Sequence, residues 1–257
     1  MGVFDEHLAD WRAYTATPWA RIRYAVVRRT LTDSLASLGP GPFRVLDVGG
    51  GDGLDALPLA AAGHQVTLLD PSEQMLELAR QRAAAEGAGL ITVVGGLDDL
   101  ASLSATPFDL VLCHFVLQYR EVDLVADLAR LVAATRPGGL LSLIAPNPAS
   151  AVLTRLLRDS PAAALAELDR DTAHTVTFDH EVRKLSVDEV EALLSRAGCR
   201  IAGRFGGRIA NDLVVDDARK DDPSHFADLE ALELALCDQE PFWRIGAFWQ
   251  LVARRLG

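Results

Sequence analysis

A glycine-rich segment is the part of the sequence best suited to hold a ligand. Residues 47–53 read Asp-Val-Gly-Gly-Gly-Asp-Gly and follow a short apolar run, at the predicted start of a helix. Glycines at 49, 51 and 53 let the backbone turn tightly and let a ligand approach where a Cβ atom would block it. The dinucleotide-binding pattern Gly-x-Gly-x-x-Gly would need glycine where Leu54 stands, so the spacing disfavours nicotinamide cofactors. The alternative is a tight turn that binds nothing.

Asp70 is the second residue whose position suits a ligand. It ends the next predicted strand, 21 residues after Gly49. There its carboxylate can accept hydrogen bonds from both hydroxyls of a ribose. Alternatively Asp70 caps the helix that follows, although Ser72 is better placed for that role.

These residues need a sheet edge to position them, and the surrounding sequence predicts one. Between residues 43 and 146, short apolar runs alternate with segments of helical periodicity, which is typical of a parallel sheet covered by crossover helices. The predicted strands are 44–48, 65–70, 90–94, 108–113 and 140–145, with helices at 72–86 and 121–135. The second of these helices is expected to stop at the Arg-Pro-Gly-Gly sequence of residues 136–139. A helix at 187–197 and strands at 199–205 and 243–254 complete a doubly wound, mostly parallel seven-stranded α/β fold.

The chain is expected to form a single domain over residues 1–257, because it has no internal repeat and no low-complexity linker. Helical sequence at 1–40 precedes a core at 43–146 that would carry the ligand site. Residues 147–185 lack strand-like alternation and are predicted to form a helical lid over the strand ends. Residues 211–240 are predicted to form a second, acidic helical insertion.

Composition excludes several classes of protein. With 257 residues, 24% of them charged and 49% hydrophobic, the chain should fold around a sizeable core without disulfides. Its three cysteines are widely spaced and indicate neither a zinc site nor a disulfide framework, so a cytoplasmic protein is expected. No apolar run approaches the 18 or so residues that span a bilayer, and no membrane partner is expected.

The negative charge is concentrated in one segment. The formal net charge is −11, of which residues 211–240 contribute −8, leaving −3 for the rest of the chain. Affinity for nucleic acid requires basic surface. Because most of the negative charge belongs to one peripheral segment, the total does not exclude an RNA partner.

Several segments together resemble one enzyme family. The Asp-x-Gly-x-Gly-x-Gly pattern at 47–53, followed by Asp70, resembles motif I and the ribose-binding acid of class I S-adenosylmethionine-dependent methyltransferases. The chain as a whole is similar to the tRNA 5-carboxymethoxyuridine methyltransferases over residues 44–53, 62–70, 109–119, 136–143, 206–213 and 229–242. The sequence has no Gly-x-Ser-x-Gly elbow, Walker loop or His/Glu metal motif, so oxidoreductase and hydrolase chemistry is disfavoured.

The resemblance implies S-adenosyl-L-methionine as the cofactor and no metal. It implies cofactor contacts from Arg23, Asp47, Gly49, Gly50, Gly51, Asp70, Leu97, Asp98 and His114. The Arg23 guanidinium can fork onto the methionyl carboxylate, and Asp98 would face the adenine amino group. The structural alternatives are a solvated helix arginine for Arg23, a helix cap for Asp98 and a hydrogen-bonded structural histidine for His114.

The chemistry of the acceptor decides which residues are catalytic. The carboxylate acceptor that the resemblance implies needs no general base, because the cofactor's methyl group is already activated. Arg208, after the sixth predicted strand, is a candidate to orient that carboxylate, or alternatively pairs with Asp212. A hydroxyl acceptor would need a base, for which His114, His174 and His180 are candidates.

The methyl acceptor is expected to be tRNA or a small molecule. The tRNA enzymes of this type carry a lysine-rich run after the fifth strand, where residues 174–180 of this chain contain no lysine. Each lost phosphate contact weakens RNA binding, so a metabolite O-methyltransferase is the alternative. A cofactor-binding protein without transferase activity is a third hypothesis. The sequence indicates no oligomeric state.

Overall fold

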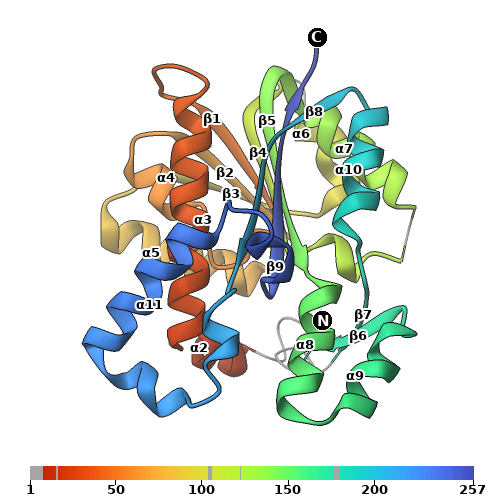
Figure 1. The fold of residues 1–257 in the computed structure, drawn as a ribbon. Coiled ribbons are helices and arrows are strands. Elements are labelled where there is room, and N and C mark those ends of the chain that lie inside the picture. Colours follow the sequence, from red (N-terminus) through yellow and green to blue (C-terminus); the bar gives the residue numbers. More distant parts are fainter. Residues whose placement is uncertain (1–7, 16, 104–105, 122, 176–179) are drawn as a thin grey trace.

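A seven-stranded sheet lies at the centre of the part of the chain that the computed structural model describes, residues 8–15, 17–103, 106–121, 123–175 and 180–257 (Figure 1). The strand order is β3-β2-β1-β4-β5-β9-β8. The strands are β1 (Arg44–Val48), β2 (Gln65–Asp70), β3 (Leu90–Val94), β4 (Phe108–His114), β5 (Thr135–Pro146), β8 (Cys199–Gly207) and β9 (Phe248–Arg255). β1 to β5 pair in parallel, whereas β9 is antiparallel to β5 and β8. The predicted doubly wound, mostly parallel α/β fold is confirmed.

Helices cover both faces of the sheet (Figure 1). One face carries α3 (Pro18–Ala36), α4 (Leu57–Ala61) and α5 (Glu73–Glu86), and α11 (Pro223–Leu236) packs on α3. The other carries α6 (Leu100–Leu103), α7 (Leu124–Ala134) and α10 (Val187–Arg196). Apolar side chains of α3 and α5 pack against one set of strand residues, and those of α7 and α10 pack against the other set. The sheet is therefore buried on both faces, as its nearly continuous apolar strands predict.

The segment predicted to be a helical lid contains strands as well as helices. α8 (Pro148–Arg158) and α9 (Pro161–Leu168) are followed by an antiparallel hairpin of β6 (Thr172–Thr175) and β7 (His180–Arg183). The prediction that residues 147–185 are entirely helical is therefore wrong. Each of these strands has only four residues, too few for alternation to be visible in the sequence. Thr172 and Thr175 of β6 and Val182 of β7 favour extended backbone. Residues 176–179, which include part of the lysine-free run, lie outside the described residues.

Three further boundaries differ from the prediction. β5 begins at Thr135, so residues 136–139 lie within a strand whose pairing with β4 shifts between Phe108 and Leu110. β9 begins at Phe248 and not at 243, because residues 242–245 form a short 3-10 helix. The helical region predicted at 1–40 consists of α2 (Leu8–Thr15) and α3, and residues 1–7 lie outside the described residues. The break between the two helices is marked by Thr17, whose side chain caps α3.

The acidic segment holds the loop that follows β8. Glu233, fully buried on α11, accepts hydrogen bonds from the backbone N–H groups of Ile209 (2.9 Å) and Asn211 (2.7 Å). Phe226 and Leu229 of the same helix pack against Ile22 of α3. Burial raises the pKa of Glu233 above its usual value of 4.5, against the effect of the backbone donors. The helix thus fixes the backbone next to Arg208, which has a left-handed φ of 56°.

We expect Glu233→Ala to lower the free energy of unfolding by about 2–3 kcal/mol, because it leaves two buried N–H groups without acceptors. Asp228→Ala on the same helix is the control. Asp228 is exposed, so its removal should change stability by no more than about 0.5 kcal/mol. Urea unfolding followed by circular dichroism measures both values, and equal stabilities for the two variants would contradict this role of Glu233.

Candidate functional site

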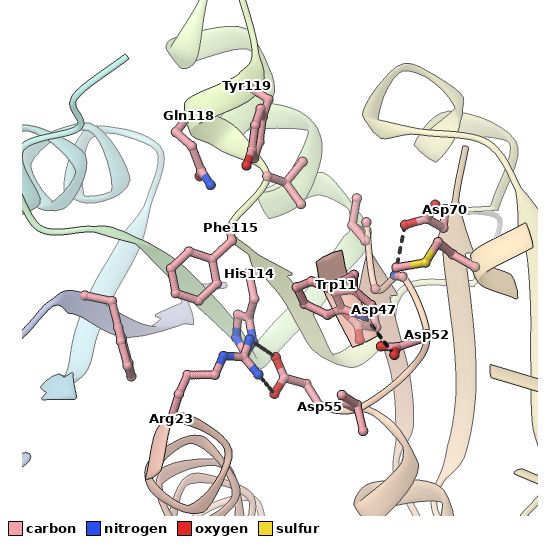
Figure 2. A pocket seen from close by; sticks show the side chains of 18 of the residues that line it. Trp11, Arg23, Asp47, Asp52, Asp55, Asp70, His114, Phe115, Gln118 and Tyr119 are labelled. Carbon is pink, nitrogen blue, oxygen red and sulfur yellow. Dashed lines mark hydrogen bonds and ion pairs between the residues drawn. The ribbon is translucent and has the colours of Figure 1, made fainter. Parts of the chain in front are cut away.

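A cavity of about 480 Å³ opens at the carboxyl ends of β1, β2 and β4, the edge at which open α/β sheets bind ligands. Figure 2 shows its wall from close by. Residues predicted from the sequence make up much of this wall: Arg23, Asp47, Gly49, Gly50, Gly51, Asp70, Leu97, His114 and Arg208. The fold therefore brings together residues that are up to 185 positions apart in the chain.

The glycine-rich turn forms the wall beside β1. Gly49 has a φ of 68°, and a Cβ atom there would lie 2.4 Å from Cγ2 of Val116. Gly51 has a φ of 54°, and its N–H donates to Oδ2 of Asp70 at 2.9 Å. Only glycine adopts these angles without strain and leaves the space open. The turn is thus held tightly against the end of β2 with its backbone facing the cavity.

Asp70 is fixed by two backbone donors. Besides Gly51, the N–H of Ser72 donates to Oδ1 at 2.8 Å, and the residue is only 7% exposed. The Ser72 hydroxyl caps α5 by accepting from the N–H of Met75, as predicted. Asp70 is therefore not needed as the helix cap and presents a preorganised carboxylate to the cavity.

A buried ion pair joins α3 to the end of the glycine-rich turn. Both terminal nitrogens of Arg23 donate to the carboxylate of Asp55, at 2.5 and 2.6 Å, and His114 Nδ1 lies 2.8 Å from the same carboxylate (Figure 2). The three side chains are no more than 8% exposed. Burial opposes ionisation of Asp55, but Arg23 and His114 together hold its pKa below its usual value. The cluster therefore carries a permanent Arg–Asp charge pair.

Both ring nitrogens of His114 are engaged by the protein. Nε2 lies 2.9 Å from the Ser142 hydroxyl, which accepts from the side-chain amide of Gln250 at 3.0 Å. Because the Asp55 carboxylate only accepts, Nδ1 carries a proton, and neutral His114 accepts from Ser142 through Nε2. Burial lowers the pKa of His114 below 6.5, and the charge of Arg23 lowers it further. His114 thus stays neutral near pH 7 and offers no nitrogen to a bound acceptor.

Acidic side chains lie around the glycine-rich turn in the wall of the cavity. Asp47 is 1% exposed, and its Oδ2 has no hydrogen-bond partner among the described residues. Burial raises the pKa of Asp47 well above its usual value, and the neighbouring Asp55 adds to the increase. Asp52, in the turn itself, accepts from the indole N–H of Trp11 on α2 at 2.9 Å. Asp52 also pairs with Arg82 at 3.0 Å. Arg120 and Arg208 line the cavity as well as Arg23, so its wall offers groups of both signs of charge to a ligand.

Two of the predicted site residues, Asp98 and Arg208, form ion pairs with neighbouring side chains. Asp98 does not line the cavity: its side chain is 62% exposed and pairs with Arg120 at 3.0 Å and with Arg130 at 3.6 Å. Its carboxylate is thus engaged by two arginines, and a contact from this side chain to adenine stays a prediction. Arg208 lines the cavity and also forms the alternative salt bridge, with Asp212 at 2.8 and 3.0 Å.

Sequence reasoning missed several lining residues. Asp55 lies two residues beyond the glycine motif, but its partner Arg23 is 32 positions away and no local pattern connects them. Phe115 could not be predicted as a lining residue either. Its side chain is directed by a left-handed φ of 57°, which the tertiary structure sets and the sequence does not indicate. Gln118 and Tyr119, just after β4, were part of a matching segment but received no role.

The comparisons with known proteins agree with this geometry. A family model described as a methyltransferase domain matches residues 45–139. The tRNA 5-carboxymethoxyuridine methyltransferase of Escherichia coli K12 is 32% identical over 241 residues, which cover 93% of this chain and 90% of that protein. This chain belongs to that family of S-adenosylmethionine-dependent methyltransferases. As an enzyme of this family, the methyltransferase uses S-adenosyl-L-methionine as its cofactor.

Two other relatives extend the comparison. The ubiquinone biosynthesis O-methyltransferase of Xanthomonas axonopodis is 35% identical to the methyltransferase over 112 residues, 44% of this chain and 46% of that one. The magnesium protoporphyrin IX methyltransferase of Synechocystis, solved with S-adenosylhomocysteine bound, has a TM-score of 0.62 at 19% identity, covering 96% of this chain and 94% of that one. The structural likeness supports the fold.

Within its described residues the methyltransferase has neither a membrane-spanning helix nor a cluster of metal-ligating side chains. No helix there is long and apolar enough to cross a membrane. No group of three or more His, Cys, Asp and Glu side chains in that part of the chain could hold a metal ion.

We expect Gly49→Ala to weaken the binding of S-adenosylhomocysteine by about tenfold or more, the equivalent of roughly 1.4 kcal/mol. The added Cβ would collide with Val116, so the turn or Val116 must move, and both line the cavity. Calorimetric titration measures the affinity.

Gly63→Ala is the matched control. Gly63 also has a positive φ, 90°, but a Cβ atom there meets nothing within 4 Å. Its substitution carries a similar backbone strain without closing the cavity, so affinity should stay unchanged. Equal affinities for the two variants would contradict the role of the glycine turn.

Proposed function

We propose that this methyltransferase transfers a methyl group to the carboxylate of 5-carboxymethoxyuridine in tRNA. The similarity to the E. coli enzyme over 93% of the chain carries the proposal, because it extends through the acidic segment that lies outside the methyltransferase-domain match. On this proposal the whole chain acts as one domain, to which residues 147–185 and 211–240 are additions. A tRNA substrate would place the enzyme in the cytoplasm.

The cavity fits the cofactor in charge and in shape. The ribose hydroxyls of S-adenosyl-L-methionine can donate to the fixed carboxylate of Asp70. The methionyl carboxylate of the cofactor can accept from Arg23. Both terminal nitrogens of Arg23 donate to Asp55, whereas its Nε makes no hydrogen bond within the described residues. Arg23 can therefore donate from Nε to a second carboxylate while it remains paired with Asp55. A positively charged group bound beside the glycine turn would favour the ionised form of Asp47, whose Oδ2 has no hydrogen-bond partner among the described residues.

The remaining wall of the cavity provides for the acceptor. When bound, S-adenosyl-L-methionine supplies a methyl group on a positively charged sulfur, so the protein has mainly to position a nucleophile in line with it. Asp212 binds Nε and one terminal nitrogen of Arg208, and the other terminal nitrogen has no partner within the described residues. Arg208 can therefore orient an acceptor carboxylate. The engagement of both nitrogens of His114 supports a reaction without a general base.

A small-molecule O-methyltransferase is the second candidate. The partial match to a ubiquinone biosynthesis O-methyltransferase and the absence of lysine from residues 174–180 favour it. His174 and His180, the other candidate bases, are both exposed, at the ends of the β6–β7 hairpin. A cofactor-binding protein without transferase activity is the third.

The deciding experiment incubates the purified enzyme with S-adenosyl-L-methionine and tRNA that carries unmethylated 5-carboxymethoxyuridine. We expect nucleoside mass spectrometry to show conversion to the methyl ester, and Arg208→Gln to raise the KM for tRNA at least about tenfold. If wild-type protein binds S-adenosylhomocysteine but forms no ester, the proposed acceptor is wrong and the small-molecule candidate gains support.

We also expect kcat/KM for tRNA to be flat between about pH 6.5 and 8.5. An acceptor carboxylate is already ionised there. Because the pKa of His114 lies below 6.5, its protonation affects the rate only at lower pH. A reaction that depended on a histidine base would lose about tenfold per pH unit below the pKa of that base. An acid limb between pH 6.5 and 8 in the pH profile would contradict a base-free reaction.

A further inference from the structure

Gln118 lines the cavity without a role in the cofactor site. It belongs to the 3-10 helix η2 (Leu117–Tyr119), which follows β4. In Figure 2 its side chain and that of Tyr119 extend from η2 toward the space occupied by the ring of Phe115. Arg23 packs against the ring of Phe115, with 5.3 Å between its guanidinium carbon and the ring centre. In this view Phe115 therefore separates Gln118 from the Arg23–Asp55–His114 cluster.

The amide of Gln118 is buried and incompletely satisfied. The residue is 3% exposed, and its Oε1 has no hydrogen-bond partner among the described residues. Such groups are rare because an unpaired buried polar atom is destabilising. Among the cavity's lining residues that the structure describes, Oε1 of Gln118 and Oδ2 of Asp47 are the buried side-chain oxygens without a partner, and Gln118 lies apart from the cluster below Phe115. A ligand that enters the cavity can supply the missing partner.

A carboxamide has a specific complement. It presents one acceptor and one donor side by side and can rotate to exchange them, so it pairs with an edge carrying an N–H next to a carbonyl. Uracil has such an edge, at N3–H and the adjacent ring oxygens. The phenolic or quinone ring of a typical small-molecule acceptor has none. In proteins that recognise a base by hydrogen bonds to its edge, aromatic side chains commonly stack on the base. Phe115 and Tyr119 line the same cavity as Gln118.

Tyr119 is itself held in place. Its ring stacks on that of His180 in β7, with 6.0 Å between ring centres and an angle of 24° between the planes. The hairpin of the 147–185 segment thus contacts η2 directly. The acceptor part of the cavity is therefore lined by η2, which the hairpin supports from outside, and by Arg208 from the loop after β8.

We propose that Gln118 recognises the uracil base of the acceptor through hydrogen bonds with N3–H and a neighbouring ring carbonyl. This inference rests on the proposed function and adds to it the residue that selects the base. Arg208 would bind the carboxylate of the substituent, and Gln118 would bind the edge of the ring. Gln118 would thereby exclude acceptors that offer a carboxylate but no adjacent N–H and carbonyl.

The test compares Gln118→Leu with wild type on a synthetic anticodon stem-loop carrying 5-carboxymethoxyuridine. Leucine keeps the approximate size of the side chain and removes both hydrogen-bonding groups. We expect kcat/KM for the stem-loop to fall about 10- to 100-fold, with the affinity for S-adenosylhomocysteine within about twofold of wild type. The unchanged cofactor affinity shows that the variant is folded. Gln81→Leu, at an exposed glutamine of α5 outside the cavity, should leave both values unchanged.

A second substrate isolates the hydrogen bond. In a stem-loop whose modified uridine is also methylated at N3, the donor is missing. Wild type should react at least about tenfold more slowly with it, whereas Gln118→Leu should discriminate little between the two substrates. The inference is overturned if Gln118→Leu methylates the normal stem-loop as fast as wild type, or if it keeps the full penalty for N3 methylation.

Failure of the proposed function gives a different result. If wild type methylates no carboxymethoxyuridine RNA while binding S-adenosylhomocysteine, the proposed acceptor is wrong and the role of Gln118 is wrong with it. If wild type methylates the stem-loop and Gln118→Leu does so equally, only the role of Gln118 is wrong.

Discussion

The buried pair of Arg23 and Asp55 is the interaction on which the rest of the site depends. It joins α3 to the glycine-rich turn, and His114 extends it to β4. From His114 the hydrogen bonds continue through Ser142 of β5 and Gln250 of β9, and the hydroxyl of Thr30 lies 2.8 Å from Gln250, back on α3. A buried ion pair repays its desolvation only when its geometry is good and its remaining polar groups are satisfied. The hydrogen-bond geometry of this circuit is good, and Nε of Arg23, which has no partner within the described residues, is left for a bound ligand to satisfy. The circuit anchors α3 as one wall of the cavity.

The same charges explain why a cofactor with both signs of charge fits here. Arg23 keeps an unused edge for a carboxylate, while Asp47 and Asp70 lie around the glycine turn where positive charge and a ribose are expected. The groups are already oriented by backbone donors and by each other, so little reorganisation is needed on binding. The acceptor side is built differently, with Arg208 held by Asp212 and by a backbone that Glu233 of the acidic segment anchors. The acidic segment thus contributes to the site from a distance.

Much of this could be predicted because it is local. The strands at 44–48, 65–70 and 90–94 were predicted with the bounds that the structure has, since each is an apolar run between turn signals. The glycine turn and Asp70 follow from short-range spacing. The pairing of Arg23 with Asp55 could not be predicted, because it depends on how α3 packs on the sheet, and no local sequence pattern encodes that packing. The pairing of Asp98 with Arg120, 22 positions away, could not be predicted for the same reason. The β6–β7 hairpin was missed because its strands are too short to show a period.

The most direct test of this account is a crystal structure of the protein with S-adenosylhomocysteine. The account predicts that the amino-acid carboxylate of the ligand contacts Arg23 while the Arg23–Asp55–His114 cluster stays intact, and that both ribose hydroxyls donate to Asp70. A ligand whose carboxylate lies away from Arg23, or whose ribose lies away from Asp70, would contradict it.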